Sequence, residues 1–254
     1  MITKLDDMIW EKDRMLWKDL VFRLEHYKDA DWDLGDECFT FYKVKGLVDS
    51  YEAFFATKPQ FAAQNVVELG VFDGGSIAFW FEWLKPRKHV ALDIKERSDS
   101  DYFHRYVAGR NLDEQIKTYW KTSQADSVRL REIVAIEFDA PLDLVIDDAS
   151  HHYGPTKTSF EVLFPLLRPG GLFLLEDWAW GHWPEFQRPD HPWASKQDLT
   201  HLVFELIESV GTRNSPIASV TAYHGFTVVE RSYHTRAQLA DFKLEDHISP
   251  PSQP

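Results

Sequence analysis

Short apolar runs alternate with amphipathic stretches from residue 65 to residue 231, and this alternation constrains the fold more than any other feature of the chain. The apolar runs predict strands at 66–70, 89–94, 116–120, 142–148 and 172–175, and a hairpin of strands 217–223 and 226–231. Spacings of three and four residues predict helices at 77–84, 101–111, 126–133, 160–167 and 199–210. We therefore expect an α/β fold with a mostly parallel seven-stranded sheet and a C-terminal antiparallel hairpin. Ligands of such sheets bind at the carboxyl ends of the strands.

The segments on either side of this alternation have a different character. Residues 1–60 contain no β-rich run, and their larger apolar side chains recur loosely at helical spacing. We expect a helical N-terminal extension that acts as a cap or as a dimerisation arm, and in the second case a homodimer or a higher homo-oligomer. Residues 61–233 form the central domain, and the polar tail 234–254 is expected to be mobile.

The charge of the chain excludes one class of partner. It carries 28 Lys and Arg against 41 Asp and Glu, a net charge of −13 without any basic run, so a nucleic acid or an anionic membrane surface would be repelled.

The single cysteine, Cys38, has no partner for an internal disulfide. Residues 1–20 contain neither a signal-peptide core nor a membrane-spanning run, so we expect a cytoplasmic protein without membrane insertion.

A turn rich in small residues follows the first predicted strand of the central domain. It runs Glu-Leu-Gly-Val-Phe-Asp-Gly-Gly-Ser from Glu68 to Ser76, with Gly70 and Gly74 at Gly-x-x-x-Gly spacing. Small residues permit a tight turn and let a ligand approach the N-terminus of the next helix. Asp93 ends the second strand, at the offset where an acid accepts hydrogen bonds from a ribose diol. The glycine spacing alone fits a plain turn equally well, whereas the turn together with the two acids predicts a nucleotide-containing cofactor.

Two further predicted strands end in acidic residues. The fourth ends at Asp147-Asp148, followed by Ala-Ser-His151-His-Tyr, and the fifth ends at Glu176-Asp177. Carboxylates that converge at one sheet edge raise one another's pKa unless a cation lies between them. Their oxygens suit Mg²⁺ or a related divalent ion, which makes a bound alcohol more acidic, and a histidine nearby can then remove its proton.

These features also have structural interpretations. Acids at strand ends commonly cap helices, so one of Asp147 and Asp148 is expected to be structural. The His151-His152 pair alone is more often a loop feature than a base. The two acidic strand ends, the adjacent histidine and the glycine-rich turn together favour a metal site.

The turn with Glu68 and Asp93 resembles the cofactor signature of class I methyltransferases, which have a Rossmann-like fold. The resemblance implies S-adenosylmethionine as the cofactor, with Glu68 and Gly70 near its methionine end and Asp93 on its ribose. Gln124 and Asp126 follow the third strand, where that family contacts adenine, although a helix cap at Ser123 or Asp126 is an equal alternative. The cofactor-binding residues expected in this way are Glu68, Gly70, Gly74, Ser76, Asp93, Gln124, Asp126 and Asp147.

The acidic motifs are similar, more specifically, to those of Mg²⁺-dependent sugar O-methyltransferases, which include macrolide-sugar enzymes of the mycinamicin pathway and have cephalosporin-hydroxylase-like relatives. The similarity covers about residues 62–180. It implies Asp148, Glu176 and Asp177 as metal ligands and His151 as the general base. Ala149 departs from the glycine that is usual at its position, a change that the backbone tolerates.

Aromatic side chains cluster just after the second acidic strand end. Trp178, Trp180, Trp183 and Trp193 lie within 16 residues. Aromatic faces suit the C–H faces of a sugar ring, so this loop is interpreted as a saccharide platform or lid, and packing against the N-terminal arm or a second subunit is an equal alternative. The residues expected to contact the acceptor are His152, Tyr153, Trp178 and Trp180.

The expected reaction is in-line transfer of a methyl group from S-adenosylmethionine to a hydroxyl of a sugar, carried by a glycoside, an oligosaccharide or a polysaccharide precursor. Three alternatives stay open. A catechol-type O-methyltransferase would need a flat apolar acceptor slot, and a cephalosporin-hydroxylase-like protein would need an additional oxidant system. A non-catalytic cofactor-binding subunit would use the aromatic loop as an interface.

Overall fold

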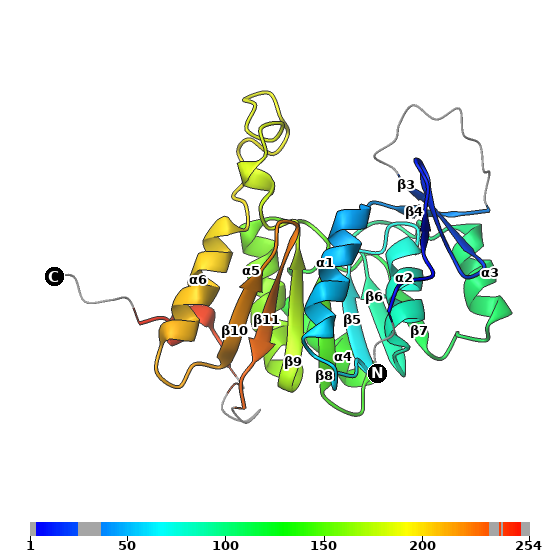
Figure 1. Ribbon diagram of the computed structural model, residues 1–254. Coiled ribbons are helices and arrows are strands. Elements are labelled where there is room, and N and C mark those ends of the chain that lie inside the picture. The colour runs from blue at the N-terminus through cyan, green and yellow to red at the C-terminus, as the bar shows by residue number, and fades with distance from the viewer. Residues whose placement is uncertain (1–3, 25–36, 234–238, 240, 250–254) are drawn as a thin grey trace.

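The computed structural model describes residues 4–24, 37–233, 239 and 241–249. Its centre is a seven-stranded sheet in the order β10-β11-β9-β8-β5-β6-β7 (Figure 1). β11 runs antiparallel to β9 and to β10, and the other neighbouring strands are parallel. The predicted mostly parallel sheet with an antiparallel hairpin is therefore confirmed. The strands are β5 (Asn65–Leu69), β6 (Lys88–Leu92), β7 (Ile116–Tyr119), β8 (Leu142–Asp147), β9 (Leu167–Glu176), β10 (Ile217–Ala222) and β11 (Phe226–Arg231).

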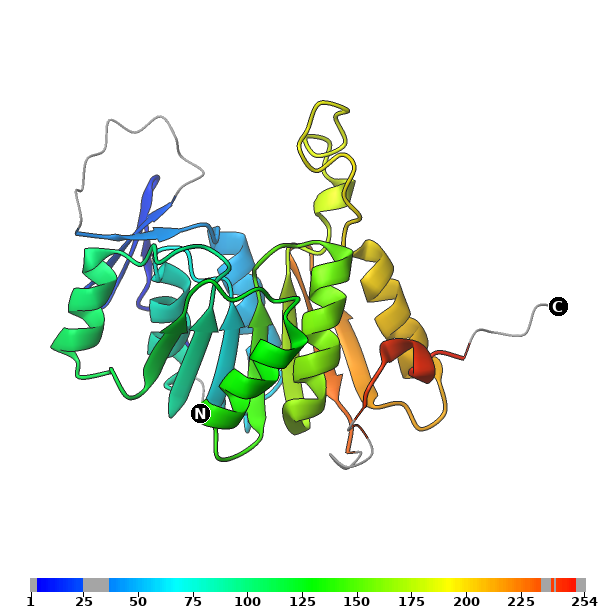
Figure 2. The same ribbon diagram turned by 180° about the vertical axis from the view of Figure 1, so that it is seen from behind.

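Helices cover both faces of this sheet (Figures 1 and 2). One layer contains α1 (Lys45–Ala56), α2 (Gly75–Leu84) and α3 (Asp101–Gly109), and the other contains α4 (Ser127–Glu137), α5 (Tyr153–Leu163) and α6 (Thr200–Gly211). Because side chains alternate in direction along a strand, Val66 of β5 packs with the first layer and Val67 with the second. None of the helices in the described ranges is long and apolar enough to cross a membrane.

The bounds of α5 and β9 differ most from the sequence prediction, and α5 begins at Tyr153 rather than at residue 160. The helix expected at 160–167 ends at Leu163, where the short 3₁₀ turn η1 (Phe164–Leu166) follows, and β9 begins at Leu167 rather than at 172. Pro165 has no backbone N–H to continue an α-helix, so the chain leaves the helix before its apolar periodicity ends.

The prediction of a helical N-terminal extension is wrong for most of its described residues. β1 (Ile9–Trp10), β2 (Arg14–Trp17), β3 (Leu20–Leu24) and β4 (Phe39–Phe41) form a four-stranded sheet, and only α1 fits the expected helix. Along β2 and β3 every second side chain is buried, which is a strand period. The turn at Lys18, whose φ is 57°, puts Trp17 and Leu20 at a three-residue spacing that imitates a helix. The rest of the extension, residues 1–3 and 25–36, lies outside the described residues.

The N-terminal sheet shares a core with the central domain. Phe41 of β4 packs against Phe22 and against Phe79 of α2, with ring centroids 5.1 and 5.2 Å apart. Asp73 of the glycine-rich turn accepts a hydrogen bond from the amide of Thr40 in β4 (2.6 Å). The strand is thereby fixed against the turn, and a division of the chain at residue 60 stays a prediction.

Part of the C-terminal tail packs against the domain, contrary to the expectation that the whole tail is mobile. Leu239, Phe242 and Leu244 are buried in the core that also contains α5. Leu244 is the first residue of the 3₁₀ turn η4 (Leu244–His247). Apolar side chains within a polar segment supply this contact, and the segment's average polarity concealed it. Residues 234–238, 240 and 250–254 lie outside the described residues.

We expect Phe242→Ala to lower the free energy of unfolding by about 3 kcal/mol, because the ring packs against Phe160 and Phe164 and its removal leaves a cavity. Chemical denaturation followed by circular dichroism measures the change. Tyr233→Ala, at an 86% exposed position, is the control and should change stability by less than about 0.5 kcal/mol. Equal stability of Phe242→Ala and the wild type would contradict the packing of the tail.

Candidate functional site

A cavity of about 470 Å³ opens at the carboxyl ends of β5, β6, β8 and β9, where the strand order reverses about β5. This is the edge at which parallel sheets bind ligands. The segment 178–198, between β9 and α6, projects beyond the same edge (Figures 1 and 2). It contributes aromatic side chains to the cavity wall, namely Trp180, Trp183, Phe186 and Trp193.

The turn after β5 requires glycine at Gly70. Its φ is +98°, and a Cβ atom there would lie 2.2 Å from the carbonyl oxygen of Asp148. Asp93, at the end of β6, holds the same turn, since one of its oxygens accepts hydrogen bonds from the amides of Val71 (3.0 Å) and Phe72 (3.1 Å). Gly70 and Asp93 both line the cavity, as expected of cofactor-binding residues.

Ser76 also lines the cavity, while Glu68 supports it from within the core. The hydroxyl of Ser76 donates a hydrogen bond to Glu68. The other carboxylate oxygen of Glu68 lies 2.8 Å from Nε2 of His89, which is fully buried on β6. Glu68 therefore orients Ser76, and its predicted role near the cofactor would be indirect.

Gln124 lines the cavity and is braced by Asp147 behind it. Its amide nitrogen donates to Asp147 (3.0 Å), which also accepts a hydrogen bond from Ser159 (2.6 Å). Burial raises the pKa of Asp147 to about 6, against the lowering effect of these hydrogen bonds. Of the acidic pair, Asp147 therefore supports Gln124 from inside the protein, and Asp148 lines the cavity.

Two other residues expected to bind the cofactor lie outside the cavity lining. Asp126 is the N-cap of α4, where it accepts a hydrogen bond from the amide of Arg129 (3.0 Å), so the helix-cap alternative describes its position. Gly74 lies against Phe103 of α3, whose ring a Cβ atom at this position would approach to 2.4 Å.

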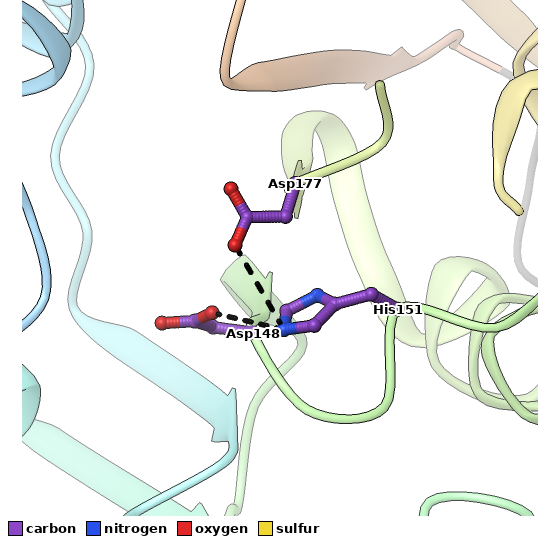
Figure 3. Close-up of side chains that lie close together, drawn as sticks. All are labelled: Asp148, His151 and Asp177. Atoms are coloured by element: carbon purple, nitrogen blue, oxygen red, sulfur yellow. Dashed lines mark ion pairs between the residues drawn. The ribbon is translucent and has the colours of Figure 1, made fainter. Parts of the chain in front are cut away.

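Asp148, His151 and Asp177 meet at the acidic strand ends (Figure 3). Nε2 of His151 lies 3.7 Å from Oδ1 of Asp148 and 4.0 Å from Oδ2 of Asp177. Burial raises the pKa of Asp177, His151 opposes this rise, and the charge of Asp148 adds to it. The three side chains come from two adjacent strand ends, as the sequence predicted.

Glu176 is paired with a lysine that the sequence analysis did not identify. Nζ of Lys43, in the segment between β4 and α1, donates to Glu176 Oε2 (2.5 Å) and to Asp148 Oδ2 (2.8 Å). Burial raises the pKa of Glu176, the charge of Asp148 raises it further, and Lys43 opposes both. Of the predicted metal ligands, Asp148 and Asp177 therefore lie together with His151, while Glu176 bonds to Lys43.

The residues at this edge fit a divalent cation. One ligand atom from each of Asp148, His151 and Asp177 lies within 4.8 Å of the others. Oε1 of Glu176 is buried and has no hydrogen-bond partner among the described residues. Carboxylate oxygens suit Mg²⁺, Mn²⁺ or a similar ion, and the imidazole of His151 lies beside them.

The residues expected to contact the acceptor are divided between the cavity and its surroundings. Trp180 lines the cavity, and its indole N–H donates to the carbonyl of His151 (2.6 Å). His152 packs against Trp180 and Trp193 from outside the lining. Tyr153 donates to Glu205 (2.7 Å), and Trp178 donates to the carbonyl of Tyr223 (2.8 Å), so both have structural partners away from the cavity.

Lys43 had a sequence signal that could have revealed it. Phe39, Phe41 and Lys43 are buried, whereas Tyr42 and Val44 between and after them are exposed. A lysine in the buried phase of a strand-like alternation calls for an acidic partner inside the protein. The partners lie 105 and 133 residues away in sequence, so no local pattern identifies them.

A family model described as a methyltransferase domain matches residues 67–178. The chain is 29% identical over 197 residues to demethylmacrocin O-methyltransferase of Streptomyces fradiae, an alignment that covers 69% of this chain and 46% of that protein. It is 37% identical over 168 residues to L-olivosyl-oleandolide 3-O-methyltransferase of Streptomyces antibioticus, covering 63% and 40%. The chain thus spans less than half the length of these curated relatives.

The solved structure of the MycE methyltransferase from the mycinamycin biosynthetic pathway, in complex with Mg, SAH and mycinamycin VI, is also similar. It is 28% identical with a TM-score of 0.56, and the match covers 76% of this chain and 51% of that one. These findings confirm the resemblance to methyltransferases and, with the seven-stranded sheet, the class I fold. The roles of individual residues stay predictions.

We expect Gly70→Ala to destabilise the protein by about 2 kcal/mol and to weaken cofactor binding, because the added Cβ meets the carbonyl of Asp148 in a left-handed backbone. Denaturant unfolding and calorimetric titration with S-adenosylhomocysteine measure the two effects. Gly46→Ala is the matched control, since a Cβ atom there has nothing within 4 Å. A Gly70→Ala protein with wild-type stability and affinity would contradict the close approach of the turn to β8.

Proposed function

We propose, from the methyltransferase domain at residues 67–178, that this chain transfers a methyl group from S-adenosylmethionine to a sugar hydroxyl with the help of a divalent cation. The observation that carries the proposal is the meeting of Asp148, His151 and Asp177 at the cavity formed by the glycine-rich turn. A cavity of about 470 Å³ is in the range of small-molecule sites.

The cofactor would lie along the turn after β5. The glycine at Gly70 admits a ligand against the backbone, and Ser76 offers its hydroxyl at the start of α2. Asp93 would accept a hydrogen bond from the ribose through Oδ1, which has one backbone partner, the amide of Lys95, whereas Oδ2 has two. Gln124, held by Asp147, would present its side chain to the base.

Asp148, Glu176 and Asp177 would hold the cation, with one free oxygen on Glu176 and one on Asp148 that Lys43 does not engage. When bound, the cation would fix hydroxyl oxygens of the acceptor and lower the pKa of the one that is methylated. The sheet would keep the three carboxylates in place for this role, since they lie at the ends of two adjacent strands.

His151 would act as the general base. Its Nε2 atom faces the two carboxylates, where an acceptor hydroxyl would be held, and its carbonyl is fixed by the indole of Trp180.

The aromatic wall supports a sugar as the acceptor. Trp180, Trp183 and Trp193 line the cavity on the side of the projecting segment, and aromatic rings pack well on the C–H faces of pyranose rings. The name of one relative specifies an acceptor that carries a sugar, L-olivosyl-oleandolide. A homodimeric state and a cytoplasmic location stay predictions.

We expect methyl transfer to require a divalent cation. EDTA should abolish turnover of a sugar glycoside, and added Mg²⁺ or Mn²⁺ should restore it. The measurement is mass-spectrometric detection of methylated product over a panel of glycosides, oligosaccharides and catechols. Full activity in EDTA would overturn the cation requirement, and methylation of catechols alone would make the catechol-type alternative correct.

His151→Ala should lower kcat by about 100-fold or more while leaving the affinity for S-adenosylhomocysteine within about threefold of the wild type, because it removes the base without touching the cofactor wall. His182→Ala is the matched control, since this histidine bonds to Thr200 outside the cavity lining. Loss of activity to the same degree in both variants, or unchanged turnover in His151→Ala, would exclude His151 as the base.

A further inference from the structure

Lys43 is a buried cation at the acidic edge of the sheet. Its side chain is 4% exposed, and its ammonium contacts the carboxylates of Asp148 and Glu176 at 2.8 and 2.5 Å. It comes from the segment between β4 and α1, outside residues 67–178. The N-terminal part of the chain therefore contributes a charge to a site whose acids all belong to the methyltransferase domain.

The two carboxylates each use one oxygen for Lys43 and keep the other. Asp148 gives Oδ2 to the lysine, and its Oδ1 is the atom that lies 3.7 Å from His151. Glu176 gives Oε2 to the lysine, and its Oε1 is buried without a hydrogen-bond partner in the part of the chain that the structure describes. The ammonium thus holds both side chains through one oxygen of each and does not contact the other oxygen.

We propose that Lys43 is the internal counter-ion of the cation site, which holds Asp148 and Glu176 together when no metal is bound and lowers the affinity of the site for a divalent ion. The inference rests on the proposed function, because it assumes that a cation binds at these acids. Three carboxylates with one ammonium leave a net charge of −2 beside His151, which a single divalent ion neutralises.

The sign of the effect follows from charge and from the low polarity of the surroundings. An ammonium that shares two carboxylates with a metal ion repels that ion, and the repulsion is strong where water is excluded. Fully buried Tyr51 of α1 marks such surroundings, since burial raises the pKa of its phenol and the charges of Glu176 and Asp148 raise it further. Without the lysine the acids would bind a metal more tightly and would repel one another more strongly when it is absent.

The test compares Mn²⁺ binding, by isothermal titration and by electron paramagnetic resonance, in the wild type, Lys43→Met and Lys43→Gln. Both variants should bind Mn²⁺ about tenfold more tightly or better, and their melting temperatures without metal should fall below that of the wild type and recover when Mn²⁺ is added. Lys45→Met, which removes an exposed lysine two residues away that pairs with Asp49, should change neither quantity.

Unchanged or weaker Mn²⁺ binding in the two Lys43 variants would overturn the counter-ion role. If the variants fold only in the presence of Mn²⁺, the proposal is supported, and if they fail to fold even with millimolar Mn²⁺, the lysine serves the fold alone and the proposal is wrong. Absence of Mn²⁺ binding in every protein would sink the cation site itself. If the wild type and Lys43→Met both bind Mn²⁺ with the same affinity, the cation site stands and only the role given to Lys43 is wrong.

Discussion

The carboxylates at the ends of β8 and β9 repel one another, and the charges of the other site residues are arranged around this repulsion. The two strands are adjacent and parallel, and the apolar burial of β8 leaves no freedom to separate them. Asp148, Glu176 and Asp177 are therefore held together by the sheet. Lys43 and His151 face them, and an edge with this excess of negative charge favours whatever brings positive charge to it.

Residues 40–43 contact three different parts of the central domain. Phe41 packs on α2, Thr40 donates its amide to Asp73 of the glycine-rich turn, and Lys43 reaches the acids. Within four residues, Thr40 thus contacts the turn, Phe41 the core and Lys43 the acidic edge. A disturbance of β4 would be felt at the cofactor side and at the cation side together, although the methyltransferase match begins only at residue 67.

Features that depend on local periodicity could be predicted from the sequence, whereas contacts between residues far apart in the sequence could not. Most strands and helices from Asn65 to Arg231 could be predicted because they have a clear period. A glycine, proline or acid also lies at or near the end of most of them, although not of β7 or β11. The N-terminal strands could not be predicted in this way. The turn at Lys18 between the paired strands β2 and β3 gives the apolar residues a spacing that resembles that of a helix. Asp147 and Asp148 are both aspartates at one strand end, and only the structure distinguishes them: Asp147 bonds to Gln124 and Ser159, while Asp148 lines the cavity.

Three of the eight described non-glycine residues with positive φ line the cavity, and their hydrogen bonds explain how this part of the site is kept in place. Phe72, His151 and Asp177 are non-glycine residues with positive φ, a conformation that persists only where neighbours enforce it. The amide of Phe72 is held by Asp93, the carbonyl of His151 by Trp180, and the amide of Asp177 by the carbonyl of Gly225. Each of these residues is thus fixed by a hydrogen bond from a different element, so the fold itself places His151 and Asp177 at the cavity.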